Sequence, residues 1–99
     1  MALEQWGFIY VADGCDPDRD TTVVDTGRSR TVLVGCGTHE QAPAVARRLV
    51  AEGAQLIELC GGFGPVQTAA VIQAIDEAVP VGTVSYGPEA IGGLHALFG

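Results

Sequence analysis

A carboxylate and a thiol stand just before a glycine-rich turn in residues 55–65, which read Gln-Leu-Ile-Glu-Leu-Cys-Gly-Gly-Phe-Gly-Pro. The apolar residues around Glu58 predict a strand over residues 55–60, and Pro65 predicts the start of a helix. In a parallel sheet, such a turn lies at the carboxyl edge, where α/β proteins bind ligands. The segment therefore predicts a functional site but does not define its reaction.

Glu58 and Cys60 are the candidate catalytic residues. The neighbours of Glu58 in the strand point to the opposite face of the sheet, and burial without a partner would suit a carboxyl group to acid–base work. The alternative is a structural carboxylate, hydrogen-bonded to the backbone or to an arginine. Cys60 adjoins a helix start, where a thiolate is favoured, although small buried cysteines are also common core residues.

The glycine turn can direct backbone N–H groups toward an anion at the start of the following helix. The alternative is a tight turn whose glycines serve positive φ angles. Other polar residues follow or end the remaining strands and would meet the turn at the same sheet edge. The candidate ligand-binding residues are Gly61, Gly62, Phe63, Gly64, Asp13, His39 and Tyr86.

Two metal-binding patterns can be tested from spacing. Cys15, Cys36 and Cys60 with a histidine could in principle hold zinc, but their wide spacing matches no compact zinc motif. Residues 16, 18 and 20 are alternating aspartates, as in a calcium loop. Thr21 and Gly27 replace the glycine and the closing glutamate of that loop, which excludes an EF-hand. No metal site is predicted; a weak divalent-ion site and a solvated acidic loop remain alternatives for residues 13–20.

Composition indicates one small domain over residues 1–99. The chain has 99 residues, 47% of them hydrophobic, and no run near the roughly 20 apolar residues of a membrane span. The N-terminal segment lacks the basic flank of a signal peptide, so a cytoplasmic location without membrane contact is expected. Three cysteines without a close pair favour reduced thiols.

The charge balance excludes whole classes of function. Twelve acidic residues against five basic ones give a formal charge of -7, whereas nucleic-acid binding depends on clustered positive charge. All five basic residues are arginine. Without lysine, the chain alone cannot form a Schiff base, hold pyridoxal phosphate or build a Walker-type phosphate loop. No particular cofactor is predicted.

The apolar pattern predicts strands over residues 5–12, 31–36, 55–60 and 81–86, with helices near residues 41–50 and 65–79 and a short helix toward Phe98. Asp16 before Pro17 favours a short helix over residues 17–24, while the β-branched residues at 21–24 favour a strand. We take the helix as the expectation. The fold class is then α/β, a small open, mainly parallel sheet of about four strands with flanking helices.

Three stretches resemble an uncharacterised family of small bacterial α/β domains of unknown function. They are Glu-Leu-Cys-Gly-Gly-Phe-Gly at 58–64, Val-Pro-Val-Gly-Thr-Val-Ser-Tyr-Gly at 79–87 and the Asp-Pro pair at 16–17. The resemblance implies an α/β fold over nearly the whole chain and no established activity. A histidine shortly after the Asp-Pro pair belongs to that pattern, but Asp20 and Thr21 occupy these positions.

Two functions are consistent with these features. The first is binding of a small anionic or carbonyl-containing metabolite at the carboxyl edge, with acid–base chemistry by Glu58. The second is a noncatalytic assembly or regulatory module that forms a homo-oligomer. The helix over residues 66–79 is apolar over a broad arc, and a short chain has little core to cover it, so a homo-oligomer is expected.

Overall fold

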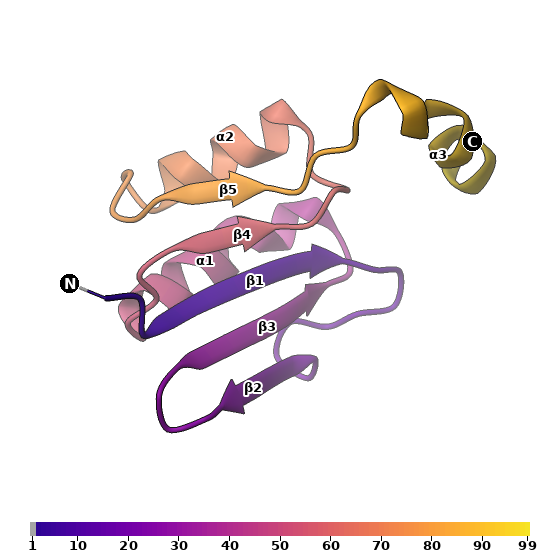
Figure 1. Ribbon diagram of the computed structural model, residues 1–99. Coiled ribbons are helices and arrows are strands. Elements are labelled where there is room, and N and C mark those ends of the chain that lie inside the picture. Colours follow the sequence, from indigo (N-terminus) through magenta and orange to yellow (C-terminus); the bar gives the residue numbers. More distant parts are fainter. Residues whose placement is uncertain (1) are drawn as a thin grey trace.

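A computed structural model describes residues 2–99, which form a five-stranded sheet with helices (Figure 1). The strands are β1 (Gln5–Val11), β2 (Thr21–Asp25), β3 (Arg30–Cys36), β4 (Ile57–Leu59) and β5 (Val81–Thr83). The α-helices are α1 (Ala42–Ala51), α2 (Pro65–Ala74) and α3 (Ile91–Phe98), and the short 3-10 helices are η1 (His39–Gln41) and η2 (Pro88–Ala90). Within residues 2–99, none of the helices has the length and apolar character that crossing a membrane requires.

The strand order is β2-β3-β1-β4-β5. Strand β1 pairs in parallel with both β3 and β4, and β4 pairs in parallel with β5. Only β2 runs antiparallel, alongside β3. The expected α/β class with a mainly parallel sheet is confirmed, and β2 is the additional strand.

The helix expected over residues 17–24 is wrong, because this segment forms a turn followed by β2. The Asp20 N–H donates to the Asp16 carbonyl at 2.7 Å and the Thr21 hydroxyl donates to the Pro17 carbonyl at 2.8 Å, which closes the turn. The Gly35 N–H then donates to the Asp20 carbonyl at 2.9 Å, where the segment meets β3. Pairing with β3 suits the β-branched residues of β2 better than a helix does.

Helices α1 and α2 lie on the same side of the sheet (Figure 1). The core fills the space between them and the sheet, where strand residues meet side chains of the helices. The largest fully buried side chains are Ile9, Leu49, Ile57, Leu59, Val34, Val71 and Cys36. A sheet covered on one face requires strands that alternate between buried and more exposed positions, as β4 does with its pattern buried, exposed, buried.

The other side of the sheet, which we call the open face, carries the side chains that alternate with this core. Its residues include Trp6, Phe8, Tyr10, Leu33 and Glu58, with Thr31 of β3 and Thr22 and Val24 of β2 in the same rows. Leu33, Phe8 and Glu58 stand in register across β3, β1 and β4. Among residues 2–99, no helix covers this face (Figure 1).

Helix α2 ends at Ala74, well before the expected residue 79. Asp76 and Glu77 have φ angles of 51° and 57°, a left-handed backbone that terminates the helix. Val71 is the buried residue of α2, and Val66 is 79% exposed. Much of the broad apolar arc of this helix therefore faces outward.

Gly35 offers a test of the packing on the open face. A Cβ atom at Gly35 would lie 2.8 Å from the Cys15 sulfur and 2.9 Å from the Tyr10 ring. We expect Gly35→Ala to lower the free energy of unfolding by about 1–3 kcal/mol through overpacking. Gly82→Ala is the matched control, because a Cβ there meets nothing within 4 Å. Urea denaturation of both variants checks this, and equal losses would contradict it.

Candidate functional site

A cavity of about 820 Å³ lies at the carboxyl edge of the sheet. Its lining residues come from the ends of β1 and β4, from η1, from the segment after β5 and from α3. They are Val11, His39, Cys60, Gly61, Gly62, Tyr86, Leu94, His95, Phe98 and Gly99. The chain leaves β1 toward β3 on one side and leaves β4 toward β5 on the other. This is the switch point of the sheet, the place where open α/β sheets bind ligands.

The glycine turn after β4 forms the floor of the cavity. The Phe63 N–H donates to the Cys60 carbonyl at 3.1 Å, and the Gly64 N–H donates to Gln67 Oε1 at 2.9 Å. Within residues 2–99, no hydrogen bond from the N–H of Gly61 or Gly62 to a protein acceptor is formed. These two N–H groups remain able to bind a ligand.

None of the glycines in this turn has a positive φ, and Gly61 serves close approach. The positive-φ glycines of the chain lie elsewhere, so the alternative proposed from the sequence is wrong for this turn. A Cβ atom at Gly61 would lie 2.6 Å from the Tyr86 ring. Gly61 therefore allows Tyr86 to close one side of the cavity.

His39 joins the glycine turn to the segment that follows β3. Its Nε2 atom lies 2.8 Å from the Gly62 carbonyl oxygen. Because a carbonyl can only accept, Nε2 carries the proton and Nδ1 keeps its lone pair in the neutral ring. The ring also packs edge-on against Phe63, with centroids 5.0 Å apart. His39 thus fixes the turn and leaves one nitrogen available.

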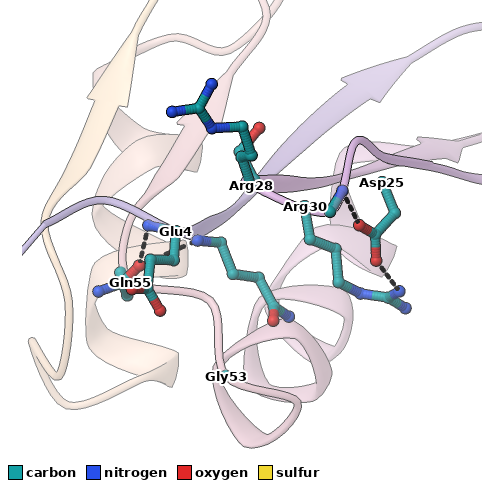
Figure 2. Close-up of a pocket in the computed structure, with 9 residues that line it drawn as sticks. Glu4, Asp25, Arg28, Arg30, Gly53 and Gln55 are labelled. Atoms are coloured by element: carbon teal, nitrogen blue, oxygen red, sulfur yellow. Dashed lines mark hydrogen bonds and ion pairs between the residues drawn. The ribbon is translucent and has the colours of Figure 1, made fainter.

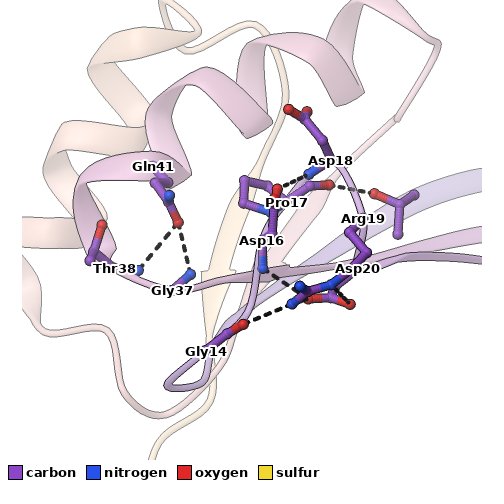
Figure 3. A network of polar contacts seen from close by, with 10 residues as sticks. Gly14, Asp16, Pro17, Asp18, Arg19, Asp20, Gly37, Thr38 and Gln41 are labelled. Atoms are coloured by element: carbon purple, nitrogen blue, oxygen red, sulfur yellow. Dashed lines mark hydrogen bonds and ion pairs between the residues drawn. The ribbon is translucent and has the colours of Figure 1, made fainter.

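The backbone just before η1 is held by the side chain of Gln41, the last residue of η1. Gln41 Oε1 accepts hydrogen bonds from the Gly37 N–H at 2.8 Å and the Thr38 N–H at 3.3 Å (Figure 3). Thr38 and Gln41 form a capping box at η1. This cap places His39 at the cavity.

The wall opposite the turn comes from α3, through Leu94, His95 and Phe98. None of these three residues was among the candidates predicted from the sequence. No local signal identifies them, because the path of the chain after β5 brings them to the edge. As a result, the only two histidines of the chain line one cavity.

The three cysteines do not form a metal site. Cys60 is half-buried and lines the cavity, whereas Cys36 is fully buried and Cys15 lies beside Tyr10 and Gly35. Burial raises the pKa of the Cys36 thiol above its ordinary value. Among residues 2–99, no group of three or more His, Cys, Asp and Glu side chains is arranged to hold a metal ion.

The structure places Glu58 away from the cavity. Its side chain is exposed on the open face, between Phe8 of β1 and Gly82 of β5 in the register of the sheet. The expected burial is wrong because both large helices cover the other face. Asp13 is exposed in the turn after β1 and does not line the cavity either.

The remaining residues of the turn take different places. Phe63 is 6% exposed and belongs to the core, while Gly64 precedes α2. Of the candidate residues, the structure brings together Cys60, Gly61, Gly62, His39 and Tyr86.

The carboxylates of Asp16 and Asp20 bind within the acidic loop itself (Figure 3), whereas Asp18 lies 3.9 Å from Arg48 of α1. Asp16 Oδ1 accepts from the Asp18 N–H at 2.9 Å, and Asp20 accepts from the Asp16 N–H at 2.8 Å. Arg19 forms an ion pair with Asp20 at 2.8 Å. The Arg19 hydrogen bond, with that from the Asp16 backbone, lowers the pKa of Asp20 to about 2. The loop is therefore ordered by its own hydrogen bonds.

A second hollow, of about 780 Å³, lies at the amino end of the strands (Figure 2). Asp25 pairs with Arg30 at 3.5 Å there, and Gln55 Oε1 accepts from the backbone N–H groups of Glu4 and Gln5 at 2.6 and 2.9 Å. Arg28 also lines this hollow. Its polar side chains therefore largely bind one another or the backbone.

The structure is a small α/β domain with α1 and α2 on one face and a cavity at the switch point of its sheet. The chain belongs to a family of unknown function, DUF6506, which matches residues 4–99. No curated protein and no solved structure matches the chain. The family supports the resemblance noted in the sequence and assigns no activity.

The different surroundings of the cysteines predict different reactivity. We expect iodoacetamide to modify Cys60 at least about tenfold faster than Cys36 near neutral pH, because burial shields Cys36 and disfavours its thiolate. Peptide mass spectrometry of samples quenched over time gives both rates. Equal rates in the folded protein would contradict the assignment, and the denatured protein provides the reference for intrinsic reactivity.

The lowered pKa of Asp20 predicts acid sensitivity of the loop. A carboxyl group with a folded-state pKa of about 2 stabilises the fold above its ordinary pKa of about 4, and this contribution is lost as the pH falls from about 4 to about 2. Asp20→Asn should therefore flatten the fall of the melting temperature over this window. Asp18→Asn, at a side chain that is 96% exposed, should keep the wild-type slope. Identical curves for wild type and Asp20→Asn would refute this role.

Proposed function

We propose that this chain binds a small anionic or carbonyl-containing metabolite in the cavity at the carboxyl edge. The observation that carries the proposal is the convergence of both histidines of the chain on that cavity, from η1 and from α3. Imidazole can donate, accept or carry positive charge near neutral pH, which makes it a versatile ligand-binding group.

The lining suits a ligand with one polar end. The N–H groups of Gly61 and Gly62 and the Nδ1 atom of His39 offer donors and an acceptor near the floor. Val11, Leu94 and Phe98 supply apolar surface. Such a combination, mostly apolar with a few convergent polar groups, is typical of small-molecule sites.

The side chains around the cavity are compatible with an anion. The formal net charge is -7, yet none of the lining residues has a carboxylate side chain. An anion at this place meets less repulsion than at the acidic loop, and protonation of either imidazole would add attraction.

His39 is better placed for acid–base chemistry at this site than Glu58. In the neutral ring, the Nε2 hydrogen bond to the Gly62 carbonyl leaves Nδ1 as a proton acceptor beside the turn. Glu58 is exposed on the open face and does not line the cavity. A proton transfer on a bound carbonyl compound would therefore use His39, with Tyr86 and Cys60 as neighbouring polar groups.

The proposal is tested with pyruvate, phenylpyruvate and phenyl phosphate as probes. Binding should shift the amide signals of Gly61 and Gly62 and the imidazole signals of both histidines in NMR spectra. His95→Gln should raise the Kd of a bound probe about tenfold, because a charge-assisted hydrogen bond contributes about 1.5 kcal/mol or more. No residue of α3 is buried, so the fold should persist.

Two control variants locate the probe. Arg28→Gln changes the amino-end hollow, and Glu58→Gln changes the carboxylate of the open face. Both should leave the Kd unchanged. A probe that shifts residues around Arg28 but not Gly61 and Gly62 would move the site to the other hollow, and an absence of shifts up to about 10 mM for every probe would overturn the proposal.

A further inference from the structure

Helix α3 lacks a partner within residues 2–99. It extends beyond the carboxyl ends of the strands (Figure 1), and its contacts are chiefly with η2, the turn that directly precedes it in the chain. None of its residues is buried, and Ile91, Leu97 and Phe98 are 65%, 77% and 84% exposed. A helix that is apolar around most of its circumference is normally buried.

The open face of the sheet lacks a cover as well. Sheets of parallel strands normally have both faces covered, and here four parallel strands have helices on one face only. Phe8 and Tyr10 stack with ring centroids 6.4 Å apart, and Trp6 and Leu33 lie in the neighbouring rows. These side chains remain partly exposed.

We propose that a second copy of this chain covers the open face, with α3 of each copy packed against the open face of the other. The occupant is another copy because the chain carries both an apolar helix without a sheet and an apolar sheet face without a helix. Figure 1 shows α3 beyond the end of its own sheet and over neither face.

The area involved is large enough for a stable dimer. Each copy exposes four large apolar side chains on α3 and just before it, namely Tyr86, Ile91, Leu97 and Phe98. At about 100 Å² for each side chain, they offer on the order of 400 Å² per copy. In a symmetric dimer both copies bury this surface, and each open face loses an equal area where it is covered. The total reaches the roughly 1,600 Å² of a standard interface.

The charges of the two surfaces are compatible with close contact. Helix α3 reads Ile-Gly-Gly-Leu-His-Ala-Leu-Phe and contains no acidic side chain. Glu58 is the one carboxylate among the residues that define the open face. The helix thus brings no like charge toward that face, although each copy carries a formal charge of -7.

Leu97→Asp and Val66→Asp provide a matched test by sedimentation equilibrium at about 50 μM, which is above the micromolar upper end of Kd values for interfaces of this size. Both wild-type side chains are almost equally exposed, at 77% and 79%, but Val66 lies on α2 away from the proposed interface. The wild type and Val66→Asp should sediment with twice the 10.2 kDa chain mass. Leu97→Asp should weaken association at least about 100-fold, as a charge in an interface centre does, and sediment as a monomer.

Trp6, the single tryptophan of the chain, reports directly on the open face. Dimer formation should shift its emission to shorter wavelength and reduce quenching by acrylamide, and Leu97→Asp should reverse both changes while the circular dichroism spectrum stays that of the wild type. Neither measurement uses a ligand, so the result is independent of the proposed metabolite site.

Three results would overturn this proposal. One is a monomeric wild type with exposed Trp6. Another is loss of the dimer in Val66→Asp but not in Leu97→Asp, which would place the interface on α2. The third is a monomer in which protection of Trp6 depends on Leu97, which would mean that α3 covers the open face of its own chain.

Discussion

The handedness of the chain crossovers determines the architecture. Helix α1 carries the chain from β3 across β1 to β4, and α2 carries it from β4 to β5, both in the same direction along the sheet. Because parallel crossovers are right-handed, both helices must lie on one face. The connection from β1 to β3 runs in the opposite direction, and a helix there would have covered the other face. Strand β2 occupies that connection instead. Residues 12–29 therefore leave one face of the sheet open.

The same topology places the cavity. Connections leave β1 and β4 in opposite directions, which opens a space at their carboxyl ends. His39 bonds across that space to the Gly62 carbonyl, and Tyr86 rests on Gly61. One side of the cavity is thereby held by the sheet and by specific contacts. The other side is formed by α3, which has no buried residue.

Patterns of neighbouring residues were sufficient to predict several of the helices and strands. The apolar, aromatic and β-branched residues of β1 and β3, the apolar face of α1 and the proline after the glycine turn each predicted the observed element. Strand β2 could not be predicted as reliably, because its five residues gain their strand conformation from pairing with β3. The sequence showed the β-branched residues but not the partner.

The residues of the site could be predicted only in part, because some of their positions also depend on distant segments of the chain. Cys60, Gly61, Gly62, His39 and Tyr86 could be placed at one edge because strand ends in a parallel sheet meet there. The exposure of Glu58 depends on which face the helices cover, and this follows from the whole topology. The role of His95 depends on where α3 lies after β5. Neither property is encoded within a few residues of the side chain concerned.

The shared use of α3 has a thermodynamic consequence. The helix forms one wall of the cavity, and in the proposed dimer it also contacts the other copy. If ligand binding fixes α3, dimer formation has a lower entropic cost, and the converse also holds. Ligand binding and self-association would then be positively cooperative, and each would strengthen the other by the same factor. In such a protein, the concentration of the chain would control its affinity for the metabolite.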